Sequence, residues 1–167
     1  MSPLQNWEER PRDEGNLFNP AFFGLLIERA ANGHRERCGE GLPWPMIYLI
    51  LPAVLHKETR DALPAAISTS MAAWTQTHPL LVATLPARAQ AMQPLVRQGL
   101  LFGLSHHLVR RETDLLHSGQ VKLVKKGERR DPTDDFRSCA TKAAFFGRWV
   151  ADSGMSATIF ALWGVRP

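Results

Sequence analysis

The chain has 167 residues, of which 20 are Lys or Arg and 16 are Asp or Glu, giving a formal net charge of +4. Because these charges nearly cancel, the composition excludes a uniformly cationic nucleic-acid-binding protein, and any basic patch has to be local. The length fits one domain with a hydrophobic core, and the apolar content of 44% excludes a wholly disordered chain.

Residues 1–18 are predicted to form a polar N-terminal arm, which precedes a single domain over residues 19–167. The arm lacks the basic and then apolar pattern of a signal peptide. The longest apolar stretch, LPWPMIYLILPAVL, holds three prolines and is shorter than the roughly 20 residues of a membrane helix. These features predict a cytoplasmic protein with no membrane partner.

The first helix is predicted to start at Asn19 and Pro20, an N-cap residue followed by proline at the first helical position. Apolar residues at helical spacing continue to Ala30, and Gly33 is expected to end the helix. The charged, glycine-rich segment 34–45 is then predicted to be an exposed loop.

Residues 46–56, MIYLILPAVLH, are apolar on every face and indicate the centre of the core. A helix is favoured over a fully buried strand, because the apolar run continues through Leu55 into a polar turn. A short helix ending at Pro64 is expected next, and then another that starts at Ser68 and ends before Pro79.

Residues 80–108 form a long helical pattern, which Pro86 and Pro94 are predicted to break into pieces. After this segment, the spacing of the apolar residues changes from helical to alternating. A turn at residues 117–119 and the alternating residues 121–125 predict a β-hairpin. Short helices followed by a hairpin are the ingredients of a winged helix. The expected fold class is therefore mainly α with a small β-hairpin, a winged-helix-like domain with additional N- and C-terminal helices.

A basic cluster on this hairpin is the strongest charge feature of the sequence. Its members, the candidate nucleic-acid contacts, are Arg110, Arg111, Lys122, Lys125, Lys126, Arg129 and Arg130. One interpretation is a wing that contacts the phosphates of double-stranded DNA. The other is a solvated hairpin, which is favoured because acidic residues such as Glu112, Glu128 and Asp131 dilute the cluster.

Thr133 or Asp134 is predicted to cap a helix that runs through residues 136–154 and ends at Gly154. One face of this helix carries small residues suited to close packing. Residues 155–165 form a last short helix or strand. Its apolar residues, including Leu162 and Trp163, are expected to be buried, because exposing them would create a large apolar patch.

Neither a GxxxxGK[ST] phosphate loop nor a GxGxxG motif occurs, so the chain is not expected to hydrolyse ATP by itself. The neighbours His106 and His107 point to different sides of a helix or strand, and a helix end explains them better than a metal site. No metal or cofactor is therefore expected.

Cys38 and Cys139 are far apart in sequence and are expected to be free, buried or half-buried thiols. Cys38 with His34, and Ser118 with His117, are the candidate nucleophile pairs. Neither has an orienting third group that the sequence identifies, so a small hydrolase is the weakest of the functional hypotheses.

Aromatic residues are the candidate anchors of the core or of a partner interface. They are Trp7, Phe18, Trp44, Trp74, Trp149 and Trp163.

Three stretches together resemble one protein family: NLFNPAFFGLLIERA, LPWPMIYLILPAVLHKETRDALP and FFGRWVADSGMSATIFALWGVRP. They are similar to the middle component of bacterial three-component ABC systems, which is related to the small subunit of Lamassu-type anti-phage and anti-plasmid complexes. The resemblance implies a winged-helix-like, non-enzymatic adaptor. Its implied partners are an SMC-like or Rad50-like ABC ATPase and an effector subunit, often a nuclease.

Two functions follow from this resemblance and from the hairpin. The first is an adaptor that bridges the ATPase and the effector in a prokaryotic defence complex. The second is a winged-helix DNA-binding module, either a regulator or the DNA-sensing part of the same complex. Salt-dependent DNA binding by the isolated protein would favour the second.

Overall fold

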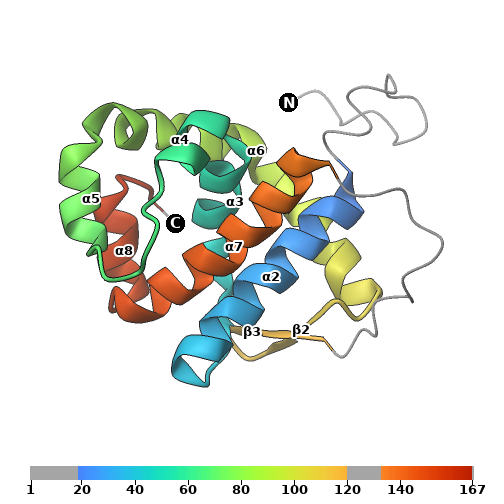
Figure 1. Ribbon diagram of the computed structural model, residues 1–167. Helices are drawn as coiled ribbons and strands as arrows, with labels where there is room; N and C mark the ends of the chain where they lie inside the picture. Colours follow the sequence, from blue (N-terminus) through green and yellow to red (C-terminus); the bar gives the residue numbers. More distant parts are fainter. Residues whose placement is uncertain (1–18, 120–132, 167) are drawn as a thin grey trace.

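The computed structural model describes residues 19–119 and 133–166, which form seven α-helices, one 3-10 helix and three short strands (Figure 1). The helices are α2 (Pro20–Cys38), η2 (Trp44–Met46), α3 (Ile47–Leu55), α4 (Lys57–Ala62), α5 (Met71–Thr77), α6 (Pro79–Ser105), α7 (Asp134–Asp152) and α8 (Ser156–Leu162). The strands are β1 (Leu42–Pro43), β2 (Val109–Glu112) and β3 (Leu115–Ser118). The mainly helical class with a small β element is confirmed.

Helices α2 and α7 lie side by side along most of their length and run in the same direction (Figure 1). Both begin as the sequence predicts. Asn19 caps α2 by accepting a hydrogen bond from the Ala21 amide, and Thr133 caps α7 by accepting one from the Phe136 amide. The small-residue face of α7 meets α2, which confirms the expected close packing.

Gly33 does not end α2, so that prediction is wrong. The helix continues to Cys38, and Gly39, with φ of 82°, provides the left-handed C-cap. A Cβ on Gly33 would lie 2.1 Å from the carbonyl oxygen of Ala144 in α7. Gly33 therefore serves close helix packing, which outweighs its cost of roughly 1 kcal/mol inside a helix.

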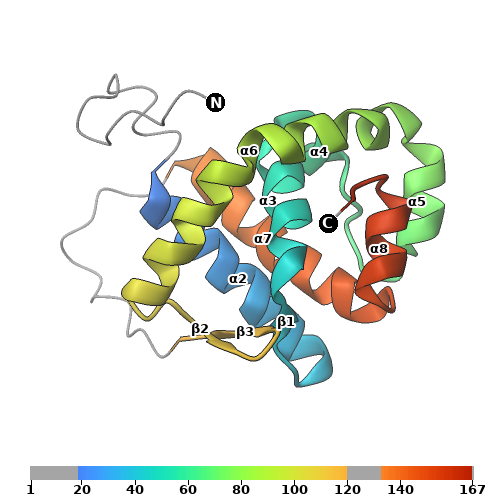
Figure 2. The same cartoon turned by 180° about the vertical axis from the view of Figure 1, so that it is seen from behind.

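Helix α3 occupies the centre of the core, between α2, α6 and α7 (Figure 2). Seven of its residues are buried, from Ile47 to Val54. The expected helix is confirmed over the alternative of a buried strand. Its apolar character on every face follows from this position, because other helices surround it.

Two arginines that the sequence did not single out bind the C-terminal end of α3. Arg60, only 2% exposed, donates to the carbonyl of Val54 at 2.9 Å and also forms an ion pair with Asp135. Arg88 donates to the carbonyl of Pro52 at 3.3 Å. Carbonyls in the last turn of a helix lack intrahelical partners and carry negative partial charge, so both guanidinium groups stabilise α3.

Helix α6 is continuous through Pro86 and Pro94, so the predicted breaks are wrong. Each proline removes one intrahelical hydrogen bond, at a cost of about 3 kcal/mol or more. Buried residues lie on both sides of the prolines, among them Leu85, Val96 and Leu100. Their packing against the core keeps the segments in one continuous helix, because tertiary contacts provide most of the stability of a helix in a protein.

The strands form one antiparallel sheet in the order β1-β3-β2. The hairpin turn lies at Thr113 and Asp114, where Thr113 has a φ of 54°. The predicted turn at 117–119 is therefore wrong, and β3 already occupies residues that were assigned to it. The predicted strand over residues 121–125 lies outside the described residues.

The segment 34–45 is not one exposed loop, because it contains the last turn of α2 and strand β1, whose Leu42 is fully buried. Leu42 pairs with Leu116 of β3. The sequence pattern missed β1, because two residues are too few to show an alternation.

After α7, the chain turns at Gly154, with φ of 88°, into α8. Trp163 is completely buried, as expected, whereas Leu162 is only half-buried. Among the described residues, none of the helices has both the length and the apolar character that a bilayer crossing requires.

Candidate functional site

Three of the candidate aromatic anchors belong to the core. The rings of Trp74 and Trp163 lie 5.1 Å apart, and Trp149 meets Trp74 edge to face at 5.9 Å. The Trp149 indole donates to the carbonyl of Thr69 at 2.7 Å, and the Trp74 indole donates to that of Ala62 at 2.9 Å. These tryptophans join α5, α7 and the segment after α8 and are buried.

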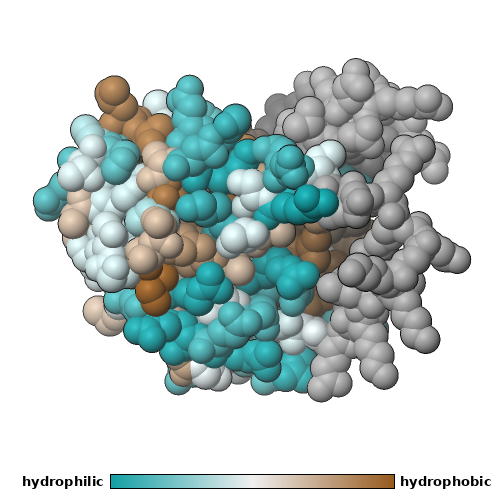
Figure 3. All heavy atoms as spheres, in the orientation of Figure 1, coloured by the Kyte–Doolittle hydropathy of each residue, from teal (hydrophilic) through white to brown (hydrophobic). Residues whose placement is uncertain are grey.

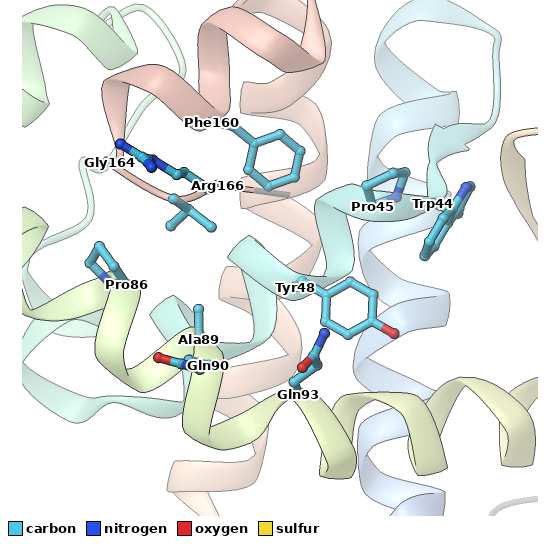
Figure 4. Close-up of a pocket in the computed structure, with 11 residues that line it drawn as sticks. Trp44, Pro45, Tyr48, Pro86, Ala89, Gln90, Gln93, Phe160, Gly164 and Arg166 are labelled. Carbon is cyan, nitrogen blue, oxygen red and sulfur yellow. The ribbon is translucent and has the colours of Figure 1, made fainter.

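Among the candidate aromatic anchors in the described part of the chain, Trp44 is the one that reaches the surface. It is half-buried and lies at the mouth of an open groove of about 690 Å³ between α3, α6 and the segment after α8 (Figure 4). The Tyr48 ring stands edge to face against Trp44, with the ring centroids 6.1 Å apart. The remaining lining residues are Pro45, Pro86, Ala89, Gln90, Gln93, Phe160, Gly164, Val165 and Arg166.

The lining of this groove is mainly apolar, with a few polar side chains at its sides. Its walls are aromatic and aliphatic, with the amides of Gln90 and Gln93 at one side and the Arg166 guanidinium at the other (Figure 4). Burial raises the pKa of the Tyr48 hydroxyl, and the nearby positive charge of Arg97 opposes the shift. The phenol is therefore neutral at physiological pH and available as a hydrogen-bond donor.

The hairpin arginines are paired with acidic neighbours. Arg110 lies 3.3 Å from the carboxylate of Glu112, and Arg111 lies 3.6 Å from that of Asp114. The guanidinium of Arg111 also stacks over the Trp44 ring, 5.1 Å from its centroid. In its described part the hairpin is charge-balanced.

The other basic candidates, Lys122, Lys125, Lys126, Arg129 and Arg130, lie outside the described residues, as do Trp7 and Phe18. The structure therefore brings Arg111 together with Trp44, whereas Arg110 pairs with Glu112 and Trp74, Trp149 and Trp163 lie together in the core.

Cys38 and His34 do lie together, one turn apart on α2, with 3.3 Å between Cys38 Sγ and His34 Nδ1. The same Nδ1 lies 3.1 Å from the carbonyl oxygen of Glu40, which is the hydrogen-bond partner expected of a protonated Nδ1. Both residues lie in the last turns of α2, far from the N-terminal end of a helix, where reactive cysteines are commonly found. This geometry does not provide an activated nucleophile.

The second nucleophile pair is also engaged elsewhere. Ser118 donates to the carboxylate of Glu28 at 2.8 Å, and His117 lies 3.8 Å from the carboxylate of Glu112. His106 caps α6 and stacks on Phe102 with 3.8 Å between the ring centroids, which is the helix-end role expected for it. Within residues 19–119 and 133–166, no group of three or more His, Cys, Asp or Glu side chains is placed to hold a metal ion.

Sequence reasoning missed most of the groove, because its residues come from three distant segments. One signal was present: between Ala62 and Val109 the only charged residues are Arg88 and Arg97. A helix as long as α6 normally has charged residues on its exposed face.

Fold and surfaces together define a small helical protein that presents an aromatic groove beside a three-stranded sheet. The chain matches the family model described as ABC-three component (ABC-3C) system Middle Component 3 over residues 7–167. It therefore belongs to this family of middle components of three-component ABC systems. Comparisons with curated proteins and with solved structures gave no significant match.

Proposed function

We propose that the protein is a non-enzymatic adaptor that holds an SMC-like or Rad50-like ABC ATPase and an effector subunit together. The observation that carries this proposal is the family match over residues 7–167, because a middle component of an ABC-3C system implies partnership with an ABC ATPase and other components. The effector is a nuclease, and the complex acts in Lamassu-type defence against phages and plasmids.

The described surface supports an adaptor. The groove beside Trp44 and Tyr48 is open to solvent and has aromatic walls, which are the preferred anchors of protein interfaces. Cys38 and His34, which form the best nucleophile pair, are not arranged as an activated site. The antiparallel sheet packed against helices supports the winged-helix assignment as the finer description of the fold.

Co-expression with the ABC ATPase and the effector encoded beside it tests the adaptor. We expect the three proteins to elute together on size exclusion at micromolar concentration and moderate salt, with interfaces above about 1,000 Å². Omitting the adaptor should separate the ATPase from the effector. If the ATPase and effector elute together without it, or if the adaptor elutes alone, the proposal is wrong.

A non-enzymatic role further requires that the purified protein neither binds nor hydrolyses ATP. Nucleotide-binding calorimetry and a phosphate-release assay measure this. ATP turnover that co-purifies with the protein through successive columns would contradict the proposal.

DNA binding is the second candidate function, because Arg110 on β2 is exposed and could exchange its pairing with Glu112 for a phosphate. Replacing Lys122, Lys125 and Lys126 with Glu should then weaken binding to all DNA sequences and flatten its salt dependence. Arg35→Glu, an exposed charge reversal on α2, is a control for the effect of a reversal away from the hairpin. Unchanged DNA affinity of the whole complex would leave these lysines as solvated side chains.

A further inference from the structure

The charged residues of the described chain are distributed unevenly. Helices α5, α6 and α8 contain no Asp, Glu or Lys, and their only charged residues are Arg88 and Arg97, both in α6. In contrast, α2, α4 and α7 carry ion pairs on their surfaces, such as Arg37 with Asp152. In Figure 3, white and brown spheres gather over α5 and α8, whereas teal spheres predominate over α2 and α7.

The outer side of α6 carries an apolar stripe. Its residues are exposed and follow one another at helical spacing: Leu80, Ala83, Ala87, Ala91, Pro94 and Leu101. Leu80 is 81% exposed and Leu101 is 56% exposed. A helix face that points to solvent is normally polar. The apolar stripe covers about four turns from Leu80 to Pro94 and resumes at Leu101 after Arg97 and Gln98, which indicates a surface that another molecule covers.

The groove borders this stripe, because α6 supplies one of its walls through Pro86, Ala89, Gln90 and Gln93 (Figure 4). On the side of the groove away from the hairpin, the nearby charged side chains are two arginines. Arg166 lines the groove, and Arg97 lies close enough to Tyr48 to oppose the rise in the pKa of that phenol. Arg88 is not part of this surface, because it turns inward to the carbonyl of Pro52.

We propose that the groove and the α6 stripe bind an amphipathic helix of another subunit of the complex, with carboxylates beside its apolar side. This inference rests on the proposed adaptor function. A helix fits because the surface runs along α6, which at 1.5 Å per residue is about 40 Å long. Apolar side chains of that helix enter the groove, and its Asp or Glu side chains pair with Arg97 and Arg166.

Other occupants fit the charges less well. A second copy of this surface would bring its own arginines against Arg97 and Arg166, with no Asp or Glu from α5, α6 or α8 to pair with them. DNA needs a row of cationic side chains for its phosphates, and two arginines on an apolar surface do not provide one.

Matched charge variants at the groove edge test the sign of the partner's charge. Gln90 and Gln93 are both exposed, and Lys and Glu have similar helix propensities, so either double replacement should fold. Gln90→Glu with Gln93→Glu should weaken binding to the co-expressed subunit about tenfold or more, because the two new carboxylates repel those of the partner helix. Gln90→Lys with Gln93→Lys should bind at least as tightly as wild type.

A third variant, Ala87→Glu with Ala91→Glu, tests the stripe and should also lose the partner. Thr141→Glu on α7, an exposed position outside this surface, is the control and should bind normally. Melting temperatures of the isolated variants show that each one is folded.

The outcomes separate this inference from the adaptor proposal. If wild type assembles and all the groove and stripe variants assemble equally well, the inference is overturned and the adaptor stands. Loss of binding in both the Glu and the Lys variants supports the groove as the interface but overturns the acidic helix. Absence of any wild-type assembly overturns both the adaptor and this inference.

Discussion

Gly147 of α7 lies directly against Ala30 of α2, so that a Cβ added to Gly147 would lie 2.0 Å from the Ala30 carbonyl oxygen. In the same way, a Cβ added to Gly33 of α2 would lie 2.1 Å from the Ala144 carbonyl oxygen of α7. Each helix thus provides a glycine where the backbone of the other approaches, and this pair of contacts sets the spacing of α2 and α7.

Gly147→Ala should destabilise the protein by about 3 kcal/mol or more. The atoms that the new Cβ would meet belong to the α2 backbone at Ala30 and His34 and cannot rotate away. Urea unfolding followed by circular dichroism measures the change. Gly24→Ala is the matched control, because the nearest atom to its Cβ would be 3.2 Å away. Gly24→Ala should cost clearly less, and equal losses for the two variants would contradict the role given to the α2–α7 contact.

Replacing buried tryptophans with Phe should separate hydrogen bonding from packing. Trp149→Phe loses the hydrogen bond to the Thr69 carbonyl, whereas Trp163 Nε1 has no partner among the described residues. Both side chains are buried and lose a similar volume. We expect Trp149→Phe to be less stable than Trp163→Phe by about 1 kcal/mol in urea unfolding. The reverse order would show that Trp163 has a partner that the described residues do not provide.

The stability of the protein should fall as the pH drops below about 6.5, and His56 should contribute to this fall. Burial lowers the pKa of His56, and the positive charge of Arg88 lowers it further. Its Nδ1 accepts the Thr59 amide hydrogen bond that caps α4, and this requires the neutral ring. The unfolded chain therefore binds a proton at a higher pH than the folded protein does, and stability is lost as the pH falls.

His56→Asn keeps a capping side chain and cannot titrate. Urea unfolding at pH 7.5 and pH 5.5 should show a smaller loss of stability for this variant than for wild type. An identical loss in both proteins would show that other groups cause the pH dependence.

The two cysteines should differ in reactivity. Cys38 is exposed, whereas Cys139 is buried beside Arg60, and burial raises the pKa of the Cys139 thiol. A maleimide at neutral pH should label one thiol in the native protein and two in denaturant, counted by mass spectrometry. Cys38→Ser should abolish rapid native labelling, and fast labelling of that variant would show that Cys139 is accessible.

The parts of the fold that the sequence predicted correctly depend on local signals. Asn19 with Pro20, and Thr133, are capping patterns that act within a few residues, and the apolar run 46–56 is long enough to indicate a central helix. The tight α2–α7 packing followed from the small residues on one side of α7.

The parts that were wrong depend on distant contacts. Gly33 has the appearance of a helix end unless Ala144 is known to lie against it. Pro86 and Pro94 break isolated helices, but α6 is held straight by the core. In the hairpin, Gly119 gave a stronger turn signal than Thr113, although Thr113 makes the turn. The groove could not be predicted, because its three walls meet only in the folded chain.

Trp44 belongs to two surfaces at once. Trp44 lines the groove. Arg111 of the hairpin also stacks on its ring, and the Trp44 amide donates to the Asp114 carbonyl at 3.0 Å. A molecule that enters the groove and turns this ring must therefore disturb the hairpin as well. If such a molecule changes the affinity of the hairpin for another ligand, thermodynamic linkage requires that the hairpin ligand change the affinity of the groove by the same factor.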